Sequence, residues 1–257
     1  MRQDGKAEAP AQAERPPAMI GVIFFDAAGT LFHLPRGVGQ HYREVALRHG
    51  CDLGEGELQA AFSAAWKTMP PRAATRAARA DDDRGWWREI VGRVLERCGV
   101  AAGALDRGAY FAELYEEFRQ PGVWELFPEV RTVLEKLRPH YRLGIISNFD
   151  GRLRAILRHL EIAAHFEPVV ISSEVGADKP DRWIFQHALE LAGVPPHAAL
   201  HVGDDPLRDW AAAEAAGLHS FHLARPANSL RDLQMWLARV DGVAPRAMRE
   251  GRASAPL

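Results

Sequence analysis

The sequence predicts an α/β protein: a Rossmann-like parallel sheet with helices on both faces, plus an inserted all-helical cap domain of the four-helix type. Short apolar runs alternate with helix-like runs in two regions of the chain, and such repetition is typical of a parallel sheet covered on both faces. A purely helical region separates the two. Because parallel sheets bind ligands in the crevice at the carboxyl ends of their strands, functional residues are expected at strand ends.

The strands and helices of the core are predicted from apolar spacing and from helix-terminating residues. Strands are expected at residues 20–25, 142–147, 169–171, 199–202 and 218–223. Helices are expected after residue 125 and at residues 150–160, 180–192, 206–216 and 230–240. Pro180 and Pro206 suit the first turns of their helices, and Asp205 is the expected N-cap of the second. Gly193 and Gly217 are expected just past the helix ends.

Residues 35–122 break the alternation and are predicted to form about four helices packed as a small bundle. Apolar residues recur there at a spacing near 3.6, as in Phe62, Ala65 and Trp66. Pro and Gly stand at both ends, which suits a domain that hinges over a core. The expected organisation is a disordered leader (residues 1–18), a core (residues 19–34 and 123–241), the cap (residues 35–122) and a loose tail (residues 242–257).

Composition and charge narrow the class of protein. The net charge is −2 at pH 7, so nothing indicates a general affinity for nucleic acid or for an anionic membrane. No apolar run approaches the ~20 residues that a membrane span needs. Cys51 and Cys98 lack metal-ligand spacing and are interpreted as small buried side chains in a reducing compartment. We expect a cytoplasmic protein, a monomer or a homodimer, without nucleic-acid or membrane partners.

The first candidate site residue ends the first predicted strand. Residues 23–31 read Ile-Phe-Phe-Asp-Ala-Ala-Gly-Thr-Leu, so an apolar run delivers one carboxylate, Asp26, to a tight turn. A carboxylate at such a place can attack phosphorus to give an aspartyl-phosphate, or it can simply cap the turn. Gly29 allows the turn to be tight, and Thr30 can donate a hydrogen bond.

The second and third candidates are suited to binding an anion. Ser147 and Asn148 follow a predicted strand and stand at the N-terminus of the next helix, which is a natural anion site, although they would also serve as a helix cap. Lys179 stands with Pro180 at the predicted start of a helix, where its charge is unfavourable to the helix dipole. An anionic partner is therefore expected for Lys179, such as Asp26 or a phosphate.

The fourth candidate is an acidic group after the predicted strand at residues 199–202. Asp204 and Asp205 follow Gly203 directly, and Asp209 comes shortly after them. Two or three acids at a strand end make a site of hard oxygen ligands that suits Mg²⁺. Helix capping accounts for Asp205 but leaves Asp204 without a structural explanation.

The four signals, in this order and each at a strand end, make residues 20–225 resemble the haloacid dehalogenase-like (HAD) hydrolases, whose helical cap lies between motifs I and II. The resemblance implies that Asp26 is the nucleophile and Lys179 its catalytic partner. It also implies that Ser147, Asn148, Thr30 and Lys179 bind the phosphate of a small phosphorylated molecule. The implied Mg²⁺ site comprises Asp26, the Ala28 carbonyl and Asp204, with Asp205 as a further candidate and Asp209 behind them.

Ala28 departs from the pattern that the resemblance implies. Phosphatases of this group carry a second Asp two residues after the first, which protonates the leaving group and then activates water. Losing a positioned acid–base group typically lowers the rate ~10²–10⁴-fold. The first interpretation is a slow Mg²⁺-dependent phosphatase, best with leaving groups that need no proton. A phospho-ligand-binding or protein-binding pseudoenzyme is an alternative.

Two further alternatives involve hydrolysis of a carbon–halogen bond or of a carbon–phosphorus bond. The motif is similar to that of haloacid dehalogenases, whose halide leaves without a proton, although those enzymes use no metal. It is also similar to that of phosphonoacetaldehyde hydrolases, which use a cap lysine as a Schiff base, and Lys67 is the lysine of this cap. Within the HAD-like hydrolases the chain resembles the REG-2-like or HDHD3-like group. The resemblance rests on residues 25–31, the cap segment 62–70 and the pair Trp86 and Trp87. His33 and His41 flank the cap entrance and are candidate proton donors, or ordinary polar histidines.

Overall fold

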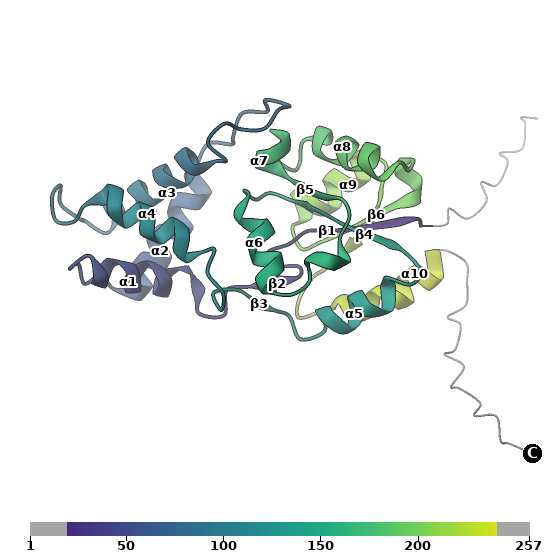
Figure 1. Cartoon of the computed structure of the whole chain (residues 1–257), viewed down its shortest axis with the longest axis horizontal. Coiled ribbons are helices and arrows are strands. Elements are labelled where there is room, and N and C mark those ends of the chain that lie inside the picture. Colours follow the sequence, from purple (N-terminus) through teal and green to yellow (C-terminus); the bar gives the residue numbers. More distant parts are fainter. Residues whose placement is uncertain (1–19, 241–257) are drawn as a thin grey trace, which may run out of the picture.

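The computed structural model describes residues 20–240, so the predicted leader and tail lie outside the described residues. The described part of the chain is elongated, with a helical unit at one end and an α/β unit at the other (Figure 1). None of the described helices is long and apolar enough to cross a membrane. Cys51 and Cys98 are free thiols, and both are partly rather than fully buried.

The α/β unit is built on a five-stranded sheet in which every paired neighbour is parallel. The strand order is β5-β4-β1-β6-β7, so the first strand lies in the middle. The strands are β1 (Val22–Phe25), β4 (Arg142–Ser147), β5 (Val169–Ile171), β6 (Ala199–Gly203) and β7 (His219–His222). Phe25 pairs with Ile145 on one side and with Val202 on the other. The residues that follow these three strands therefore emerge at one edge of the sheet.

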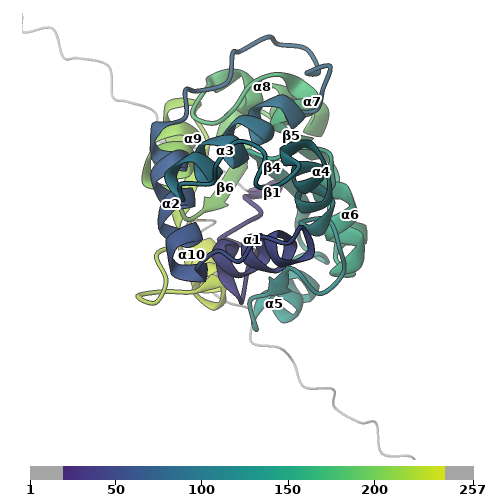
Figure 2. The ribbon, with the colours of Figure 1, turned by 90° about the vertical axis from the view of Figure 1, so that its left-hand side faces the viewer.

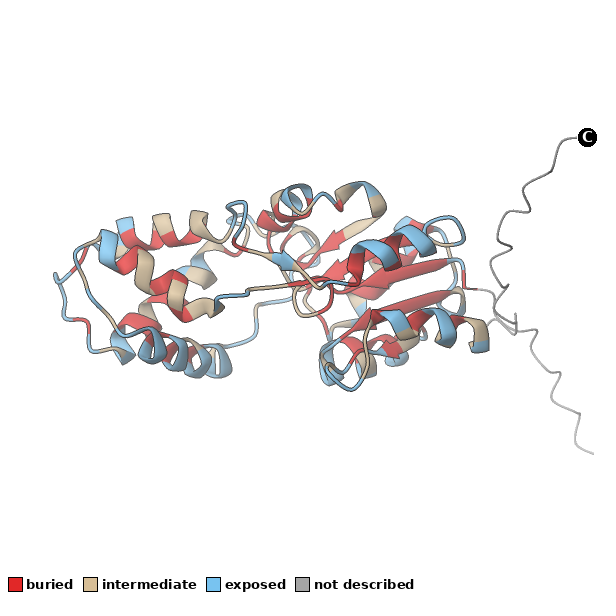
Figure 3. Cartoon of the chain, turned by 90° about the horizontal axis from the view of Figure 1, so that it is seen from below, coloured by how far each residue is buried: buried red, intermediate tan, exposed pale blue. Residues whose placement is uncertain are grey.

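Helices cover both faces of this sheet, as predicted. Ile23 and Phe25 of β1 pack on α5 (Val130–Leu137), α6 (Arg152–His159) and α10 (Leu233–Val240). Val22 and Phe24 pack on the other side with α8 (Arg182–Ala192) and α9 (Ala212–Ala215). The alternation follows from the two-residue period of a strand, which sends successive side chains to opposite faces. Figure 3 shows the strands as a buried layer between helices whose outer sides are exposed.

The helical segments that follow Asp181 and Asp205 differ from the prediction, the first in where it starts and the second in its type. Helix α8 begins at Arg182 with Asp181 as its N-cap, so Pro180 precedes the helix rather than forming its first turn. Asp205 does cap the next helical segment, but Pro206–Ala211 is a π-helix, and α-helical geometry covers only Ala212–Ala215. Helical spacing in the sequence cannot distinguish i→i+5 from i→i+4 hydrogen bonding over so short a segment.

The cap consists of α1 (Gly37–Arg48), α2 (Glu55–Thr68), α3 (Arg84–Arg97) and α4 (Arg107–Glu117), all within the segment predicted for it. Seen from the cap end, these helices lie in front of the sheet (Figure 2). The cap has a hydrophobic cluster of its own, distinct from the two clusters that flank the sheet.

A short two-stranded ribbon carries the chain into the cap and out of it. Strand β2 (Phe32–His33) pairs antiparallel with β3 (Glu125–Leu126), so that Phe32 lies opposite Leu126. The ribbon was not predicted, because two-residue strands give no period to detect. It brings the two cap junctions side by side although they are far apart in the sequence.

Residues 70–83, between α2 and α3, reach back from the cap to the core and are here called the strap. The strap runs along the top of Figure 1 towards α7 (Ser172–Val175). The Thr75 backbone N–H donates to the Gly176 carbonyl at 2.8 Å, and Asp82 accepts from the Gly151 N–H at 2.8 Å. A methyl group on Gly176 would lie 2.1 Å from the Ala77 carbonyl oxygen, so only glycine admits the strap at this position.

Candidate active site

Asp26 lies directly after β1, at the centre of the carboxyl edge of the sheet. Its side chain is buried, with 8% of the residue exposed. The Oδ1 atom accepts from the Ser147 hydroxyl at 3.2 Å and from Lys179 Nζ at 2.7 Å. Ser147 ends the neighbouring strand β4, which explains how residues so far apart in sequence meet. The structure thus brings together three of the four predicted signals around one carboxylate.

Lys179 is buried and fixed at both its backbone and its ammonium group. Asn148 braces the backbone, because its side-chain oxygen accepts from the Lys179 N–H at 2.7 Å and its amide donates to the Lys179 carbonyl at 2.8 Å. The ammonium donates to Asp26, to the Ile146 carbonyl at 3.0 Å and to Asp209 at 2.5 Å. The anionic partner expected for Lys179 is therefore present within the protein. Asn148 therefore orients this lysine.

Asp209 supports Lys179 from behind. Its Oδ1 accepts from Lys179 and lies 2.9 Å from His201 Nε2, while Oδ2 accepts from the Asp205 N–H at 3.0 Å. His201 is fully buried within β6, and its contact with Asp209 joins this strand to the helical segment that follows it. Both Asp209 oxygens are engaged, which suits a supporting residue better than a direct metal ligand.

Asp204 faces Asp26 from the end of β6. Its Oδ1 accepts from the buried Thr30 hydroxyl at 3.2 Å, so Thr30 orients an acid here rather than offering a free hydroxyl to a phosphate. A methyl group on Gly29 would lie 2.5 Å from Asp204 Oδ2, and Gly29 has a φ of +90°. The glycine after Ala28 therefore makes room for this carboxylate as well as for the turn. Asp205 points elsewhere, accepting from the Leu207 and Arg208 N–H groups and pairing with the Arg208 side chain.

Burial and charge act in opposite directions on the carboxyl groups of the site. Burial raises the pKa of Asp26 to about 6, opposed by Lys179 and reinforced by Asp209 and Asp204. Burial also raises the pKa of Asp204. The pKa of Asp209 is lowered, because Lys179 and His201 outweigh its burial. Burial lowers the pKa of Lys179, but the two carboxylates around it raise it above its ordinary value, so the ammonium stays charged.

The acidic residues fit a small divalent cation. One ligand atom each from Asp26, Asp204 and Asp209 lies within 4.8 Å of the others. Asp26 and Asp204 each have their Oδ1 engaged by donors, and within residues 20–240 no hydrogen bond is recorded to either Oδ2. These two oxygens are therefore available as ligands, and carboxylate oxygens are the donors that Mg²⁺ prefers. The raised pKa of both acids is consistent with a position where a cation would relieve their repulsion.

The site opens into a cavity of about 800 Å³ between core and cap. The core contributes Asp26, Ala28, Ser147, Lys179 and Asp204 to its walls, and the cap contributes eight aromatic residues beside aliphatic and polar ones. Ala28 faces the cavity beside Asp26, in the position where the resemblance would place a second acid. Lys67 of α2 also lines this cavity.

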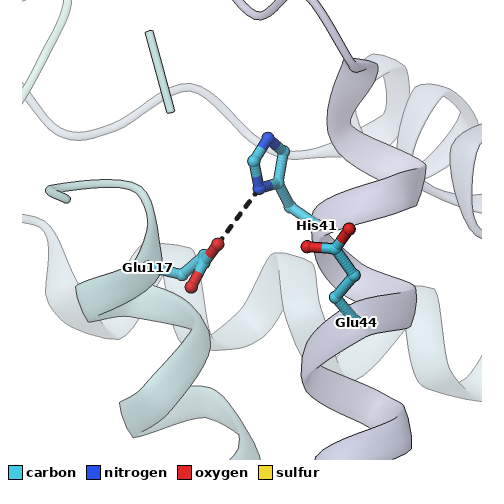
Figure 4. Close-up of side chains that lie close together, drawn as sticks. All are labelled: His41, Glu44 and Glu117. Atoms are coloured by element: carbon cyan, nitrogen blue, oxygen red, sulfur yellow. Dashed lines mark hydrogen bonds and ion pairs between the residues drawn. The ribbon is translucent and has the colours of Figure 1, made fainter. Parts of the chain in front are cut away.

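The two candidate proton donors near the cap entrance are both engaged elsewhere. His33 stacks on Phe127, with ring centroids 4.6 Å apart. His41 is fully buried within the cap, and its Nδ1 lies 3.2 Å from Glu117 Oε1 (Figure 4). Glu44 lies beside this pair, but Arg36 already binds it. Neither histidine is among the described residues that line the cavity.

A model of the haloacid dehalogenase-like hydrolases matches residues 20–217. The chain belongs to this family. Haloacid dehalogenase-like hydrolase domain-containing protein 3 of Mus musculus is 34% identical over 79% of this chain and 81% of the relative. Rhythmically expressed gene 2 protein of Drosophila melanogaster is 29% identical over 77% of this chain and 81% of the relative. These two relatives confirm the family branch that the sequence motifs indicated.

Two further similarities come from better-described members of the HAD-like hydrolases. Phosphoserine phosphatase of Thermus thermophilus is 37% identical, over 55% of this chain and 56% of the relative. A solved HAD phosphatase from Thermococcus onnurineus superposes with a TM-score of 0.59 at 23% identity, covering 85% of this chain and 98% of that one. The chain is therefore a HAD-like hydrolase with a fold that family phosphatases share.

Several residues of the site carry no signal that the sequence analysis used. His201 lies inside an apolar strand and contacts Asp209 of the helical segment that follows that strand. Asp178 adjoins Lys179, and it binds Arg72 and Arg79 of the strap at 2.9 and 3.2 Å. Arg152 is buried against the ring of Tyr115 and pairs with Asp150. Each of these contacts depends on segments that only the tertiary fold brings together.

Proposed function

We propose that this HAD-like hydrolase is a Mg²⁺-dependent phosphatase that acts on a small phosphorylated molecule through an aspartyl-phosphate. The observation that carries the proposal is the buried contact of Asp26 with Lys179 and Ser147, facing Asp204 across the cavity. A nucleophilic carboxylate, a fixed cation and a second free carboxylate together supply what phosphoryl transfer needs. The similarity to phosphoserine phosphatase over half of the chain supports the same reaction class.

In the proposed reaction an Asp26 oxygen attacks phosphorus, and the bond from phosphorus to the leaving oxygen breaks, with its electron pair going to the departing group. Water then attacks phosphorus, releases phosphate and restores Asp26. Lys179 holds the nucleophile at a fixed orientation and offers positive charge to the phosphoryl oxygens, and Ser147 donates beside it. A bound Mg²⁺ would be held by Asp26, Asp204 and the Ala28 carbonyl and would neutralise charge on the phosphoryl group.

Ala28 offers no proton to the departing group, so leaving groups that depart as stable anions are expected to react fastest. The test is a panel of acyl phosphates and alkyl phosphate esters assayed with Mg²⁺ and with chelator. We expect Mg²⁺-dependent turnover that favours acyl phosphates. No turnover of any member, together with unchanged binding of inorganic phosphate in Asp26→Asn, would point to the binding-protein alternative.

Restoring the missing acid tests the role of Ala28 directly. Ala28→Asp is expected to raise kcat for an alkyl phosphate ester by ~10²-fold or more while changing acetyl phosphate turnover little, because only the alkyl group needs a proton. Ala28→Asn is the matched control, since it adds similar bulk without an acid. An equal effect of Asp and Asn, or a fall in both rates, would show that the cavity is built for different chemistry.

Lys67 favours a second candidate function, because it lies on the wall of the same cavity. A cap lysine in this position could form a Schiff base with a carbonyl-bearing phosphonate. Treatment with phosphonoacetaldehyde and borohydride would then leave a mass adduct on Lys67, and Lys67→Arg would abolish it. Absence of the adduct rejects this candidate, and halide release from 2-haloacids in chelator tests the dehalogenase alternative in the same preparation.

A further inference from the structure

A continuous series of aromatic rings runs through the cap along the cavity and ends in the core beside the phosphate corner. We call it the aromatic wall; its members, in order, are Trp86, Trp66, Phe62, Tyr42, Phe118, Trp124 and Phe149. Successive ring centroids are 5.5, 5.9, 5.9, 6.2, 6.4 and 6.1 Å apart. All seven side chains line the cavity. The wall ends at Phe149, one residue after Asn148 and two after Ser147.

The wall is more than the packed interior of the cap. Tyr42 is buried, but the other six rings keep part of their surface exposed, and Trp66 is 39% exposed. A ring that served only to fill the cap core would lose almost all of its exposure. Apolar surface of this extent on the inside of a cavity is stabilised by a ligand that covers it.

Trp86 of the wall and its neighbour Trp87 are held in fixed orientations. The Trp86 indole N–H donates to the Pro70 carbonyl at 3.2 Å, and the Trp87 N–H donates to Asp150 at 2.7 Å. Trp66 and Trp87 lie 5.9 Å apart with planes inclined by 35°. A ring inserted between them would need about 7 Å, two contacts of roughly 3.5 Å each. A ligand ring therefore packs on the cavity side of this group and does not enter it.

The charged groups that line the cavity favour a neutral aromatic ligand over a cationic one. The cap residues that line the cavity include the cations Lys67 and Arg72, whereas the described lining carboxylates all come from the core. Arg72 already lies over the Trp86 ring at 4.6 Å. Arg72 is held there by Asp83 and Asp178, so a cationic ligand would have to displace it from this face of the wall, while a neutral planar ring would not.

Ala28 independently restricts the same ligand. Without an acid at this position the departing oxygen leaves as an anion, which disfavours aliphatic alcohols, whose pKa is near that of water at about 16. A phenolic oxygen has a pKa of about 10, as in tyrosine, and leaves far more easily. The missing acid at Ala28 and the aromatic wall thus both favour a phenolic leaving group.

We propose that the substrate is a phosphate monoester of a planar aromatic alcohol, whose ring packs on the aromatic wall while its phosphate reaches Asp26. This inference rests on the proposed phosphatase function and names its substrate class. The bond from phosphorus to the aryl oxygen breaks as Asp26 attacks. The electron pair stays on oxygen as a phenoxide, which takes its proton from water.

Binding tests the wall without requiring turnover. Methylphosphonate, benzylphosphonate and cyclohexylmethylphosphonate are titrated by calorimetry into the full chain with Mg²⁺. Benzylphosphonate is expected to bind about tenfold more tightly than methylphosphonate and several-fold more tightly than its non-planar cyclohexyl counterpart. Trp66→Leu and Trp86→Leu are expected to remove most of this advantage and to leave methylphosphonate affinity unchanged. Trp236→Leu, on α10 and away from the cavity, is the matched control.

Equal affinity for the three phosphonates in the wild-type protein would overturn the inference, as would a benzyl advantage that survives in both cap variants. Failure to bind any of the three would overturn it as well. Turnover reports separately on the proposed function: hydrolysis of acetyl phosphate without any preference for binding benzylphosphonate would support the phosphatase function and reject the aromatic substrate.

Among substituted phenyl phosphates, kcat is expected to fall steeply as the pKa of the phenol rises, and Ala28→Asp is expected to flatten that dependence. A flat series in the wild-type protein would contradict the leaving-group argument.

Discussion

Lys179 shows how single residues determine the character of this site. Its ammonium joins Asp26 to Asp209, two acids that would otherwise repel each other in a buried position. The partner of this lysine could be expected from sequence, because a cation at a helix start needs an anion and Asp26 ends the neighbouring strand of a parallel sheet. The identity of the second acid could not, since Lys179 and Asp209 lie on segments that only the tertiary fold brings together.

Asp26 makes the free energy of unfolding depend on pH. Its pKa is about 6 in the folded protein against the ordinary 3.8, so folding favours the protonated form. This stabilisation is fully present below about pH 4 and is lost as the pH rises through about 6, a total change of roughly 3 kcal/mol. In chelator, Asp26→Asn is therefore expected to gain stability relative to the wild type over that range. Denaturant unfolding at a series of pH values measures the difference.

The control for this measurement is Asp52→Asn, which removes a carboxylate from a side chain that is 74% exposed. Its stability is expected to follow the wild-type pH course closely. If the free energy of unfolding of Asp26→Asn also followed the wild-type pH course, the Asp26 carboxyl group would have the same pKa in the folded and unfolded chains. That result would refute the raised pKa.

Gly29 is expected to control metal affinity through Asp204. The Cβ of Gly29→Ala would meet the Asp204 carboxylate and displace it from Asp26, and such misplacement of a ligand lowers metal affinity about 10–100-fold. Mg²⁺ titration followed by calorimetry is the measurement. Gly103→Ala is the control, because Gly103 has a similar φ of +86° but nothing within 4 Å of its Cβ position. Similar losses of Mg²⁺ affinity in both variants would indicate general strain rather than a displaced ligand.

At the scale of elements, the segments that could be predicted from the sequence are those with a recognisable apolar pattern. Strands β4 and β5 were predicted to the residue, since buried runs of a parallel sheet are continuous and end at polar residues. The β2–β3 ribbon and the strap lack any period, and they are the segments that position the cap. The strap holds Arg76, Asp82 and Asp83 at positive φ, a conformation that such residues adopt only where surrounding contacts stabilise it.

Asp82 is expected to hold the strap on the core. Its carboxylate accepts from the Gly151 N–H and from the Ser173 hydroxyl at 2.5 Å, and hydrogen bonds to a charged group contribute about 1.5–3 kcal/mol. Asp82→Ala should therefore shift the strap towards a released state by about tenfold or more. Limited trypsin digestion measures this release, because Arg72, Arg76 and Arg79 lie in the strap.

Asp81→Ala provides the comparison for Asp82. Asp81 accepts from the Gly85 N–H within the cap and is exposed, so its loss is expected to leave strap cleavage near the wild-type rate. Equal cleavage rates for Asp82→Ala and Asp81→Ala would indicate that the backbone contacts at Gly176 and the ion pairs of the strap with Asp178 hold the strap without Asp82.

At the scale of the whole molecule, the cap is joined to the core in a way that makes it separable. The hydrophobic cluster of the cap shares no residue with the two clusters around the sheet. Its two junctions leave the core through the antiparallel pair His33 and Glu125, whose Cα atoms in such a pair are roughly 5 Å apart. The sequence predicted an inserted helical domain, but this closeness follows only from the ribbon.

Replacing residues 34–124 with an Asn-Gly turn would close that ribbon into a hairpin of a favourable type. We expect the shortened protein to unfold cooperatively, because every fully buried residue of the two clusters that flank the sheet remains and only Trp124 is lost from their margin. It should bind methylphosphonate with Mg²⁺, since Asp26, Ser147, Lys179 and Asp204 all belong to the core, and it should lose any preference for benzylphosphonate with the tryptophans of the cap. Denaturant unfolding and calorimetry decide both points. A non-cooperative transition would mean that the strap and cap complete the core, and retained benzyl preference would move the aromatic site to Phe149 and its core neighbours.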